Sequence, residues 1–401
     1  MNYPIDLESL HSLDTLKQQP KIVRFMTSSE SGFRSFGNDI RIQGRRDARP
    51  TWRVADSGCF EVVNGANVHI MDFNFNGHEN TPTLITVESG TLVLENCDLE
   101  KGGSWAIKLG KQGELILRNV RFLDLKSGGI QMSGGNLHID NVSFLQAGAY
   151  AVEALGGELF KAVGLLIQNS SATGLSLSNI EEIWLDSVRI ESSFEDGLAI
   201  TNSDLVYIAD LTAENNGRYG AYLEGDQEVG FLHCSFNRNQ VAGLALSEID
   251  SVRMLNSEMV GNKSFGGVMH QVDWMQLRGI QVGHNGVNGM MVTQGFELSI
   301  DHSTFQGNPN RGLELGHVDS ISLTQISLLN NGSGMMASDF KSLRLGENLM
   351  LSNKQFGLEI ERGEFLELHK NLIKSNHTGL LGNHIQQVHM DSNRVIGNKA
   401  G

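Results

Sequence analysis

Six acidic, basic and aromatic side chains lie in two successive stretches of the chain, and the first four of them fall at matching places. They are Glu195, Asp196, Arg218, Tyr219, Tyr222 and Glu224. Asp196 and Tyr219 each directly precede a glycine of the sequence repeat described below, and the two glycines are neighbours in that repeat. An acid, an arginine and a tyrosine that converge in a shallow groove could bind a uronate and move a proton from its C5. The same residues could instead form a surface ion pair beside a packed tyrosine.

A second group of charged side chains repeats near the C-terminus. Its members are Arg344, Glu367, His369, His389 and Asp391. Arg344 and Glu367 have the same spacing as Asp196 and Tyr219, and the spacing of His369 and Asp391 is shorter by one. A patch of histidines and acids on one face could bind a transition metal or perform acid–base chemistry. A cross-strand ladder of charges would use the same residues without a ligand.

A third pattern is an apolar stripe at predicted outward positions. Its members are Ala245, Met269, Met291 and Met336. Glu314 interrupts the stripe, and His270 is predicted to point inward as a hydrogen-bonded core residue. Methionine is frequent on surfaces that accept a protein partner, so the stripe could be an interface. A loop of the same chain could equally cover it.

These groups share one spacing because the whole chain is repetitive. A glycine followed by alternating apolar residues, as in TGLSLS and RGLELG, recurs throughout. The glycines are Gly174, Gly197, Gly220, Gly243, Gly267, Gly289, Gly312, Gly334, Gly357 and Gly379. Neighbouring glycines are about 23 residues apart, and no step departs from this value by more than one. The same step reaches back to Phe60, so about fifteen units fill nearly the whole chain.

Each unit alternates apolar and polar residues in short bursts, as at Leu313 and Leu315. This is the period of a β-strand. Two or three short strands per unit make one coil, and successive coils stack as parallel strands about 4.8 Å apart. The handedness of parallel crossovers makes the coil right-handed. The sequence therefore predicts an all-β fold, a single-stranded right-handed parallel β-helix.

An asparagine stands about four residues before many of the glycines. Asn216, Asn239, Asn285, Asn308, Asn330 and Asn353 hold that place, and Asn262 and Asn376 are displaced by one. Asparagine tolerates the left-handed conformation and can hydrogen-bond its counterparts in the coils on either side. The column therefore predicts a structural ladder.

The pattern divides the chain into three parts. Residues 1–20 are predicted to form an N-terminal capping helix, because Ile and Leu recur at near-helical spacing within 5–16. Residues 21–58 are expected to form irregular strands, and 59–401 the β-helix. The last step of the repeat falls on Gly401, so we expect a further coil or end-to-end pairing at that edge.

Composition excludes several classes of protein. The 401 residues are 40% hydrophobic and 19% charged, which is too apolar for disorder, and no apolar run reaches the roughly eighteen residues of a membrane span. A net charge of −15 argues against nucleic-acid and anionic lipid partners. The acidic start is unlike a secretory signal, and Cys59, Cys97 and Cys234 form no CxxC pair. We therefore expect a cytoplasmic protein with buried free thiols.

The glycine phrase, the asparagine column and the stretch GCFEVVNGANVHIMDFNFNG resemble the right-handed parallel β-helix proteins of the pectin-lyase-like superfamily. That superfamily includes pectate lyases, polygalacturonases, mannuronate epimerases and phage tailspikes. The resemblance implies the fold over nearly all the chain, whereas one fold hosts many activities. The NTD, DD, GHG and RIK segments of polygalacturonases and the Asp-Pro-His-Glu motif of epimerases are absent. The nearest pieces are VGHNG at 282–286 and LGHVD at 315–319.

These observations predict a scaffold that binds a protein or glycan partner, in which self-association is one option. Its binding residues would be Glu195, Glu224, Met269, Met291, Met336, Glu367, His369, His389 and Asp391. The alternative is a polysaccharide lyase or C5-epimerase acting on a uronate polymer, with Asp196, Arg218, Tyr219 and Tyr222 as catalytic residues. No two acids are adjacent in the predicted outward column, so no calcium ion and no other cofactor is expected.

Overall fold

The computed structural model describes residues 21–24, 29–31, 34–47, 49–54, 60–78 and 81–400. Every regular element in these ranges is a β-strand, and they contain no helix that could cross a membrane. The all-β parallel solenoid is confirmed, whereas the predicted capping helix in residues 1–20 lies outside the described residues. The chain forms two compact units, Met1–Glu195 and Asp196–Gly401.

The first unit begins with short strands and continues with longer coils. Its strands are β1 (Lys21–Arg24), β2 (Ser29–Ser31), β3 (Arg34–Phe36), β4 (Ile40–Gln43), β5 (Thr51–Val54), β6 (Phe60–Val62), β7 (Ala66–Met71), β8 (Asn74–Asn76), β9 (Thr83–Glu95), β10 (Asp98–Glu100), β11 (Trp105–Leu123), β12 (Gly128–Met132), β13 (Asn136–Phe144), β14 (Val152–Ala154), β15 (Gly157–Gln168), β16 (Leu175–Ser178), β17 (Ile180–Asp186) and β18 (Arg189–Glu191). Neighbouring coils pair in parallel, as β9 does with β11.

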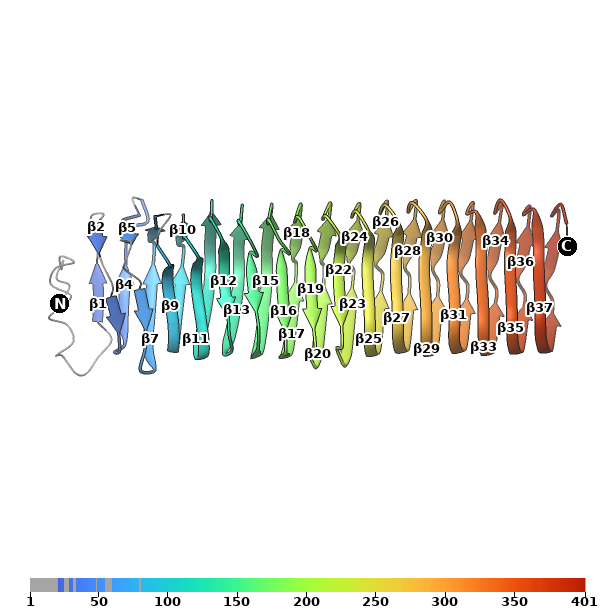
Figure 1. The fold of residues 1–401 in the computed structure, drawn as a ribbon, viewed down its shortest axis with the longest axis horizontal. Coiled ribbons are helices and arrows are strands. Elements are labelled where there is room, and N and C mark those ends of the chain that lie inside the picture. The colour runs from blue at the N-terminus through green and yellow to red at the C-terminus, as the bar shows by residue number, and fades with distance from the viewer. Residues whose placement is uncertain are drawn as a thin grey trace. The chain divides into compact units, whose positions relative to one another are not determined.

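The second unit is more regular. Its strands are β19 (Leu198–Thr201), β20 (Leu205–Ala209), β21 (Thr212–Glu214), β22 (Tyr219–Glu224), β23 (Glu228–Leu232), β24 (Ser235–Asn237), β25 (Ala242–Leu255), β26 (Glu258–Val260), β27 (Phe265–Arg278), β28 (Gln281–Gly283), β29 (Asn288–Asp301), β30 (Thr304–Gln306), β31 (Arg311–Thr324), β32 (Ser327–Leu329), β33 (Ser333–Gly346), β34 (Leu349–Leu351), β35 (Phe356–His369), β36 (Leu372–Lys374), β37 (Thr378–Asp391) and β38 (Arg394–Ile396). Figure 1 shows the long strands from β25 to β37 side by side in chain order, as their parallel pairings require.

Each coil of the second unit has three faces. The first face consists of β19, β22 and the first halves of the long strands from β25 onwards, and the second face consists of β20, β23 and their second halves. The short strands such as β21 and β24 form the third face. One left-handed residue separates the two halves of each long strand. These residues are Glu248, Gln271, Gln294, His317, Asp339, Arg362 and His384, with φ between 51 and 61°.

Buried asparagines tie the coils of the second unit together. The ladder consists of Asn216, Asn239, Asn262, Asn285, Asn308, Asn331, Asn353, Asn376 and Asn398. In each step, Oδ1 of one asparagine accepts the backbone N–H and the Nδ2–H of the previous one at 2.9–3.3 Å. The prediction of Asn330 was wrong, because Asn330 adopts the exposed left-handed position with φ of 55° and its neighbour Asn331 enters the ladder.

The repeating glycine serves close packing, and one of the predicted positions was wrong. Gly266, and not Gly267, is the repeating residue between Gly243 and Gly289, which makes the two steps on either side of it equal. A Cβ added at Gly266 would lie 2.5 Å from the carbonyl oxygen of Gly289 and 2.8 Å from Nδ2 of Asn285. No side chain fits at that distance, so the residue must be glycine because the next coil approaches so closely.

The core of each unit is built from the inward columns. Cys97 in the first unit and Cys234 in the second are buried free thiols, as predicted. Burial raises the pKa of both thiols, to about 12 and about 11 respectively. Both therefore remain protonated and act as small apolar residues.

Candidate functional site

The second face of the second unit carries an exposed aromatic pair. Trp274 on β27 and Phe296 on β29 are 48% and 50% exposed, although both are large apolar side chains. Their ring centroids are 5.1 Å apart and the ring planes are tilted by 53°. Two neighbouring exposed aromatic rings offer a larger apolar surface to a ligand than an isolated exposed residue does.

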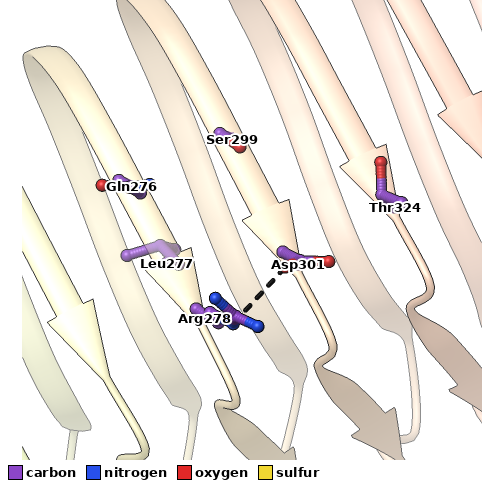
Figure 2. Close-up of a pocket in the computed structure, with 6 residues that line it drawn as sticks. All are labelled: Gln276, Leu277, Arg278, Ser299, Asp301 and Thr324. Carbon is purple, nitrogen blue, oxygen red and sulfur yellow. Dashed lines mark ion pairs between the residues drawn. The ribbon is translucent and has the colours of Figure 1, made fainter.

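A shallow polar pocket of about 270 Å³ lies on the same face. Its lining residues come from three consecutive coils: Gln276, Leu277 and Arg278 from β27, Ser299 and Asp301 from β29, and Thr324 from β31. Figure 2 shows that they lie on neighbouring strands, with Arg278 and Asp301 facing each other. Trp274, Gln276 and Arg278 are alternate residues of β27 and all three are exposed, so they share the outward side of that strand.

The polar groups of the pocket are held by partners on the same or an adjacent coil. Nε of Arg278 lies 3.5 Å from Oδ2 of Asp301, while Oδ1 of Asp301 lies 2.6 Å from Nδ1 of His302. Oε1 of Gln276 accepts a hydrogen bond from Nε of Arg253 at 3.2 Å. Hydroxyl, amide, guanidinium and carboxylate groups are therefore presented on the same face as the aromatic pair, and each can hydrogen-bond a hydroxylated ligand.

The predicted cluster of an acid, an arginine and two tyrosines does assemble in the second unit. Asp196 is buried; its Oδ1 accepts the backbone N–H of Tyr219 at 3.0 Å, and its Oδ2 lies 3.6 Å from Nη1 of Arg218. The Arg218 guanidinium lies 5.3 Å from the centre of the Tyr219 ring, which stacks on Tyr222 at 5.8 Å. The cluster is therefore compact, and Asp196 contributes to holding the loop before β22.

Acid–base chemistry at this cluster meets an electrostatic obstacle. The Tyr222 hydroxyl donates a hydrogen bond to Oε2 of Glu224 at 2.6 Å. Partial burial and this carboxylate raise the pKa of Tyr222 above its usual value. A tyrosine that must lose its proton to act as a base is hindered by both effects. Glu195 belongs to the first unit, where Oε2 accepts a hydrogen bond from Thr173 at 3.4 Å.

Sequence reasoning missed a buried acid two residues beyond Glu224. Asp226 is 1% exposed, and burial raises its pKa to about 7. The signal was present in the repeat, because the corresponding positions of later coils hold Ile249, Val272 and Val318, all apolar and buried. An acid in an apolar column is a conspicuous departure from the pattern.

The predicted C-terminal patch is a set of exposed charge pairs. Arg344 pairs in register with Glu367, and Glu367 with His389, while His369 pairs with Asp391. Nε of Arg344 lies 3.5 Å from Glu367, and Nδ1 of His369 lies 3.0 Å from Asp391. Among the described residues, no group of three or more His, Cys, Asp or Glu side chains is arranged to hold a metal ion. The geometry is that of a cross-strand ladder.

The apolar stripe on the first face differs from its prediction at two members, because Ala245 is buried as well as Met269. Met269 is 0% exposed and points into the core, because the repeating glycine is Gly266 and the outward position falls on Val268. The same shift makes His270 exposed rather than inward. Met291 and Met336 are partly exposed, as predicted.

The aromatic pair and the pocket also escaped sequence reasoning. Phe296 occupies a column whose next member is Asp319, and the partners of Trp274 in register are Ser251 and Glu297. Large aromatic residues in outward columns that hold mostly polar residues are the signal that could have identified this face.

Comparison with curated proteins yields no match. Among solved structures, a double mutant of the periplasmic alginate epimerase AlgG is similar at 12% identity and a TM-score of 0.47, covering 87% of this chain and 78% of that one. The catalytic domain of a GH87 alpha-1,3-glucanase is similar at 11% identity and a TM-score of 0.41, covering 76% of this chain and 61% of that one. The Azotobacter vinelandii mannuronan C-5 epimerase AlgE6 A-module is similar at 9% identity and a TM-score of 0.36, covering 97% of this chain and 92% of that one. At these identities and TM-scores neither a substrate nor a site transfers to this chain.

The family model described as the right handed beta helix region matches residues 128–282 and 271–400. The matched ranges cover more than half of the chain and contain most of the coils with parallel pairing described above. The resemblance to right-handed parallel β-helix proteins is confirmed. The chain therefore belongs to the right-handed β-helix family.

Proposed function

We propose that the protein binds a polysaccharide on the second face of β27, β29 and β31. The observation that carries this proposal is the exposed pair Trp274 and Phe296 beside a pocket lined by hydrogen-bonding groups. Sugar rings have apolar C–H faces and a rim of hydroxyls. An aromatic surface next to amide, hydroxyl and charged groups fits both features.

The alternative binding partner, a protein, fits this face less well. The pocket walls are polar, and charged groups surround the two aromatic rings, as at Asp273 and Glu297. The core of a protein interface is depleted in acidic residues and carries a larger contiguous apolar surface. A glycan needs only one or two aromatic platforms with polar groups around them.

The enzymatic alternative, a lyase or C5-epimerase reaction at the tyrosine cluster, is supported by the convergence of Asp196, Arg218, Tyr219 and Tyr222. Two observations favour binding without turnover. Asp196 is engaged by Tyr219 and Arg218, and the raised pKa of Tyr222 opposes its use as a base. We therefore place the function at the aromatic face.

Glycan binding is tested by calorimetry and by a panel of immobilised polysaccharides. The panel includes alginate, mannuronan and alpha-1,3-glucan, the polymers after which the similar solved enzymes are named, together with neutral beta-linked glucans. We expect saturable binding to at least one polymer, and a loss of about tenfold or more in affinity for Trp274→Ala. Trp184→Ala is the matched control, because Trp184 is also exposed but lies in the first unit.

Two outcomes would contradict the proposal. The first is the absence of binding to every polymer by the folded protein. The second is binding that Trp274→Ala and Trp184→Ala weaken equally. Release of unsaturated sugar or exchange of the C5 proton, abolished by Tyr219→Phe, would instead support the enzymatic alternative.

A further inference from the structure

We propose that the bound polysaccharide crosses the stack of coils, running along the strands from Trp274 to Arg278, and that the site holds an internal segment of several sugar rings. This inference rests on the proposed function and adds the direction and length of the ligand. The competing arrangement is a chain that runs along the stack, from one coil to the next.

The first support is the order of side chains along one strand. Trp274, Gln276 and Arg278 follow one another on the outward side of β27, four residues from end to end. At about 3.3 Å per residue this path spans roughly 13 Å, more than one sugar ring can cover. On β29 the outward residues Ser299 and Asp301 continue alongside, so the aromatic pair and the pocket form one track.

The second support is that the aromatic surface ends after two coils. In register with Trp274, the preceding coil holds Ser251 and the following coil holds Glu297. In register with Phe296, the following coil holds Asp319. In either column, a chain running along the stack would therefore leave the aromatic ring within one coil, about 4.8 Å, and meet an acidic side chain on the next coil.

The third support is the tilt of the two rings. Their planes meet at 53°, so one sugar ring cannot lie flat on both Trp274 and Phe296. A sugar that stacks on the Trp274 ring can therefore meet the Phe296 ring only at an angle. The polar pocket then receives the next sugar through Arg278 and Asp301. The site thus favours a polymer interior over a single terminal sugar.

The direction of the chain is tested by calorimetry with a length series of oligosaccharides, from disaccharide to octasaccharide, of the polymer that binds best. We expect affinity to rise at least tenfold until the oligosaccharide spans the track and then to stay constant. Trp274→Ala should weaken binding of short and long members alike. Thr324→Ala and Asp301→Asn should weaken only the members long enough to reach the pocket.

Arg344→Ala provides the control for the other direction. Arg344 lies three coils beyond Gln276 in the same outward column, about 14 Å along the stack, which is close to the length of the proposed track. We expect this variant to bind every member of the series as the parent protein does. Circular dichroism of each variant confirms that the coils remain folded.

Three results would overturn the inference: affinity independent of length, equal losses for short and long oligosaccharides in Asp301→Asn, or a loss for long oligosaccharides in Arg344→Ala. Each requires that the protein binds the glycan. The direction of the chain can therefore fail while the proposed function stands, and failure of the proposed function is recognised separately by the absence of any binding.

Discussion

Oδ1 of Asp226 accepts a hydrogen bond from the backbone N–H of Ser203, 2.7 Å away on the neighbouring coil. Oδ2 of the same carboxyl is buried and has no hydrogen-bond partner among the described residues. The nearby Glu224 adds a like charge. Burial therefore favours the neutral acid and raises the pKa of Asp226 to about 7, from 3.8 in the unfolded chain.

This carboxyl makes the free energy of unfolding depend on pH. Because the folded pKa is the higher one, the folded protein binds more protons than the unfolded chain between about pH 4 and pH 7. The stabilisation is complete below about pH 4 and is lost as pH rises through 7. At about 1.4 kcal/mol per pKa unit, the loss is at most about 4 kcal/mol.

We expect the stability of Asp226→Asn relative to the parent to increase by about 2–3 kcal/mol between pH 5 and pH 8, because asparagine stays neutral. Urea unfolding at both values measures the difference. Asp250→Asn, which changes an exposed acid on the next coil, should leave the pH dependence unchanged. A parent protein as stable at pH 8 as at pH 5 would contradict the assignment.

Substitution of two adjacent asparagines should change the stability of the protein by very different amounts. Asn331→Ala removes a buried ladder member that accepts from Asn308 and donates to the carbonyl of Phe305, so we expect a loss of about 2–4 kcal/mol. Asn330→Gly should change stability by less than about 1 kcal/mol, because glycine adopts the left-handed φ of 55° without strain. Equal losses in thermal or urea unfolding would refute the ladder assignment.

The corrected position of the methionine stripe leads to another prediction. Met269→Ala should destabilise the protein by about 2–5 kcal/mol, because it opens a cavity in the core. Val268→Ala, at the partly exposed neighbouring position, should cost about 1 kcal/mol or less. A larger loss of stability at Val268 than at Met269 would contradict this assignment and support the alignment on Gly267.

Glycines at different positions of the repeat should also differ in their tolerance of a methyl group. Gly266→Ala would place Cβ 2.5 Å from the carbonyl oxygen of Gly289, so we expect it to destabilise the fold by several kcal/mol. At Gly316 the nearest atoms to an added Cβ are side-chain atoms at 3.7 and 4.0 Å, so Gly316→Ala should be neutral or slightly stabilising. Thermal unfolding of both variants measures the difference. Similar losses of stability would contradict the argument that the next coil approaches Gly266 too closely for a side chain.

The repeat made the fold predictable, because one period fixes strands, corners and ladder together. Where the position of the repeating glycine is ambiguous, the predicted alignment was wrong by one residue. At Gly266 and Gly267 two adjacent glycines both fit the phrase, and the choice between them decides whether Met269 or Val268 faces outward. Side-chain direction alternates along a strand, so an error of one residue reverses it.

The tyrosine cluster could be predicted because its members sit at equivalent places in successive units. The aromatic pair could not be found in the same way, because Trp274 and Phe296 lie in different columns and meet diagonally across two coils. Such a contact depends on side-chain directions and on the stagger between strands, which the spacing of residues alone does not determine.

The constant register also governs how this surface can change in evolution. Each column recurs once per coil, so a gene segment encoding one whole coil can be duplicated or lost without moving other side chains between faces. Duplicating the coil that begins at Gly289 would set a second copy of Phe296 and Asp301 beside the first. Recombination alone could therefore widen the ligand-facing surface, because an added coil would pair with its neighbours in the existing register.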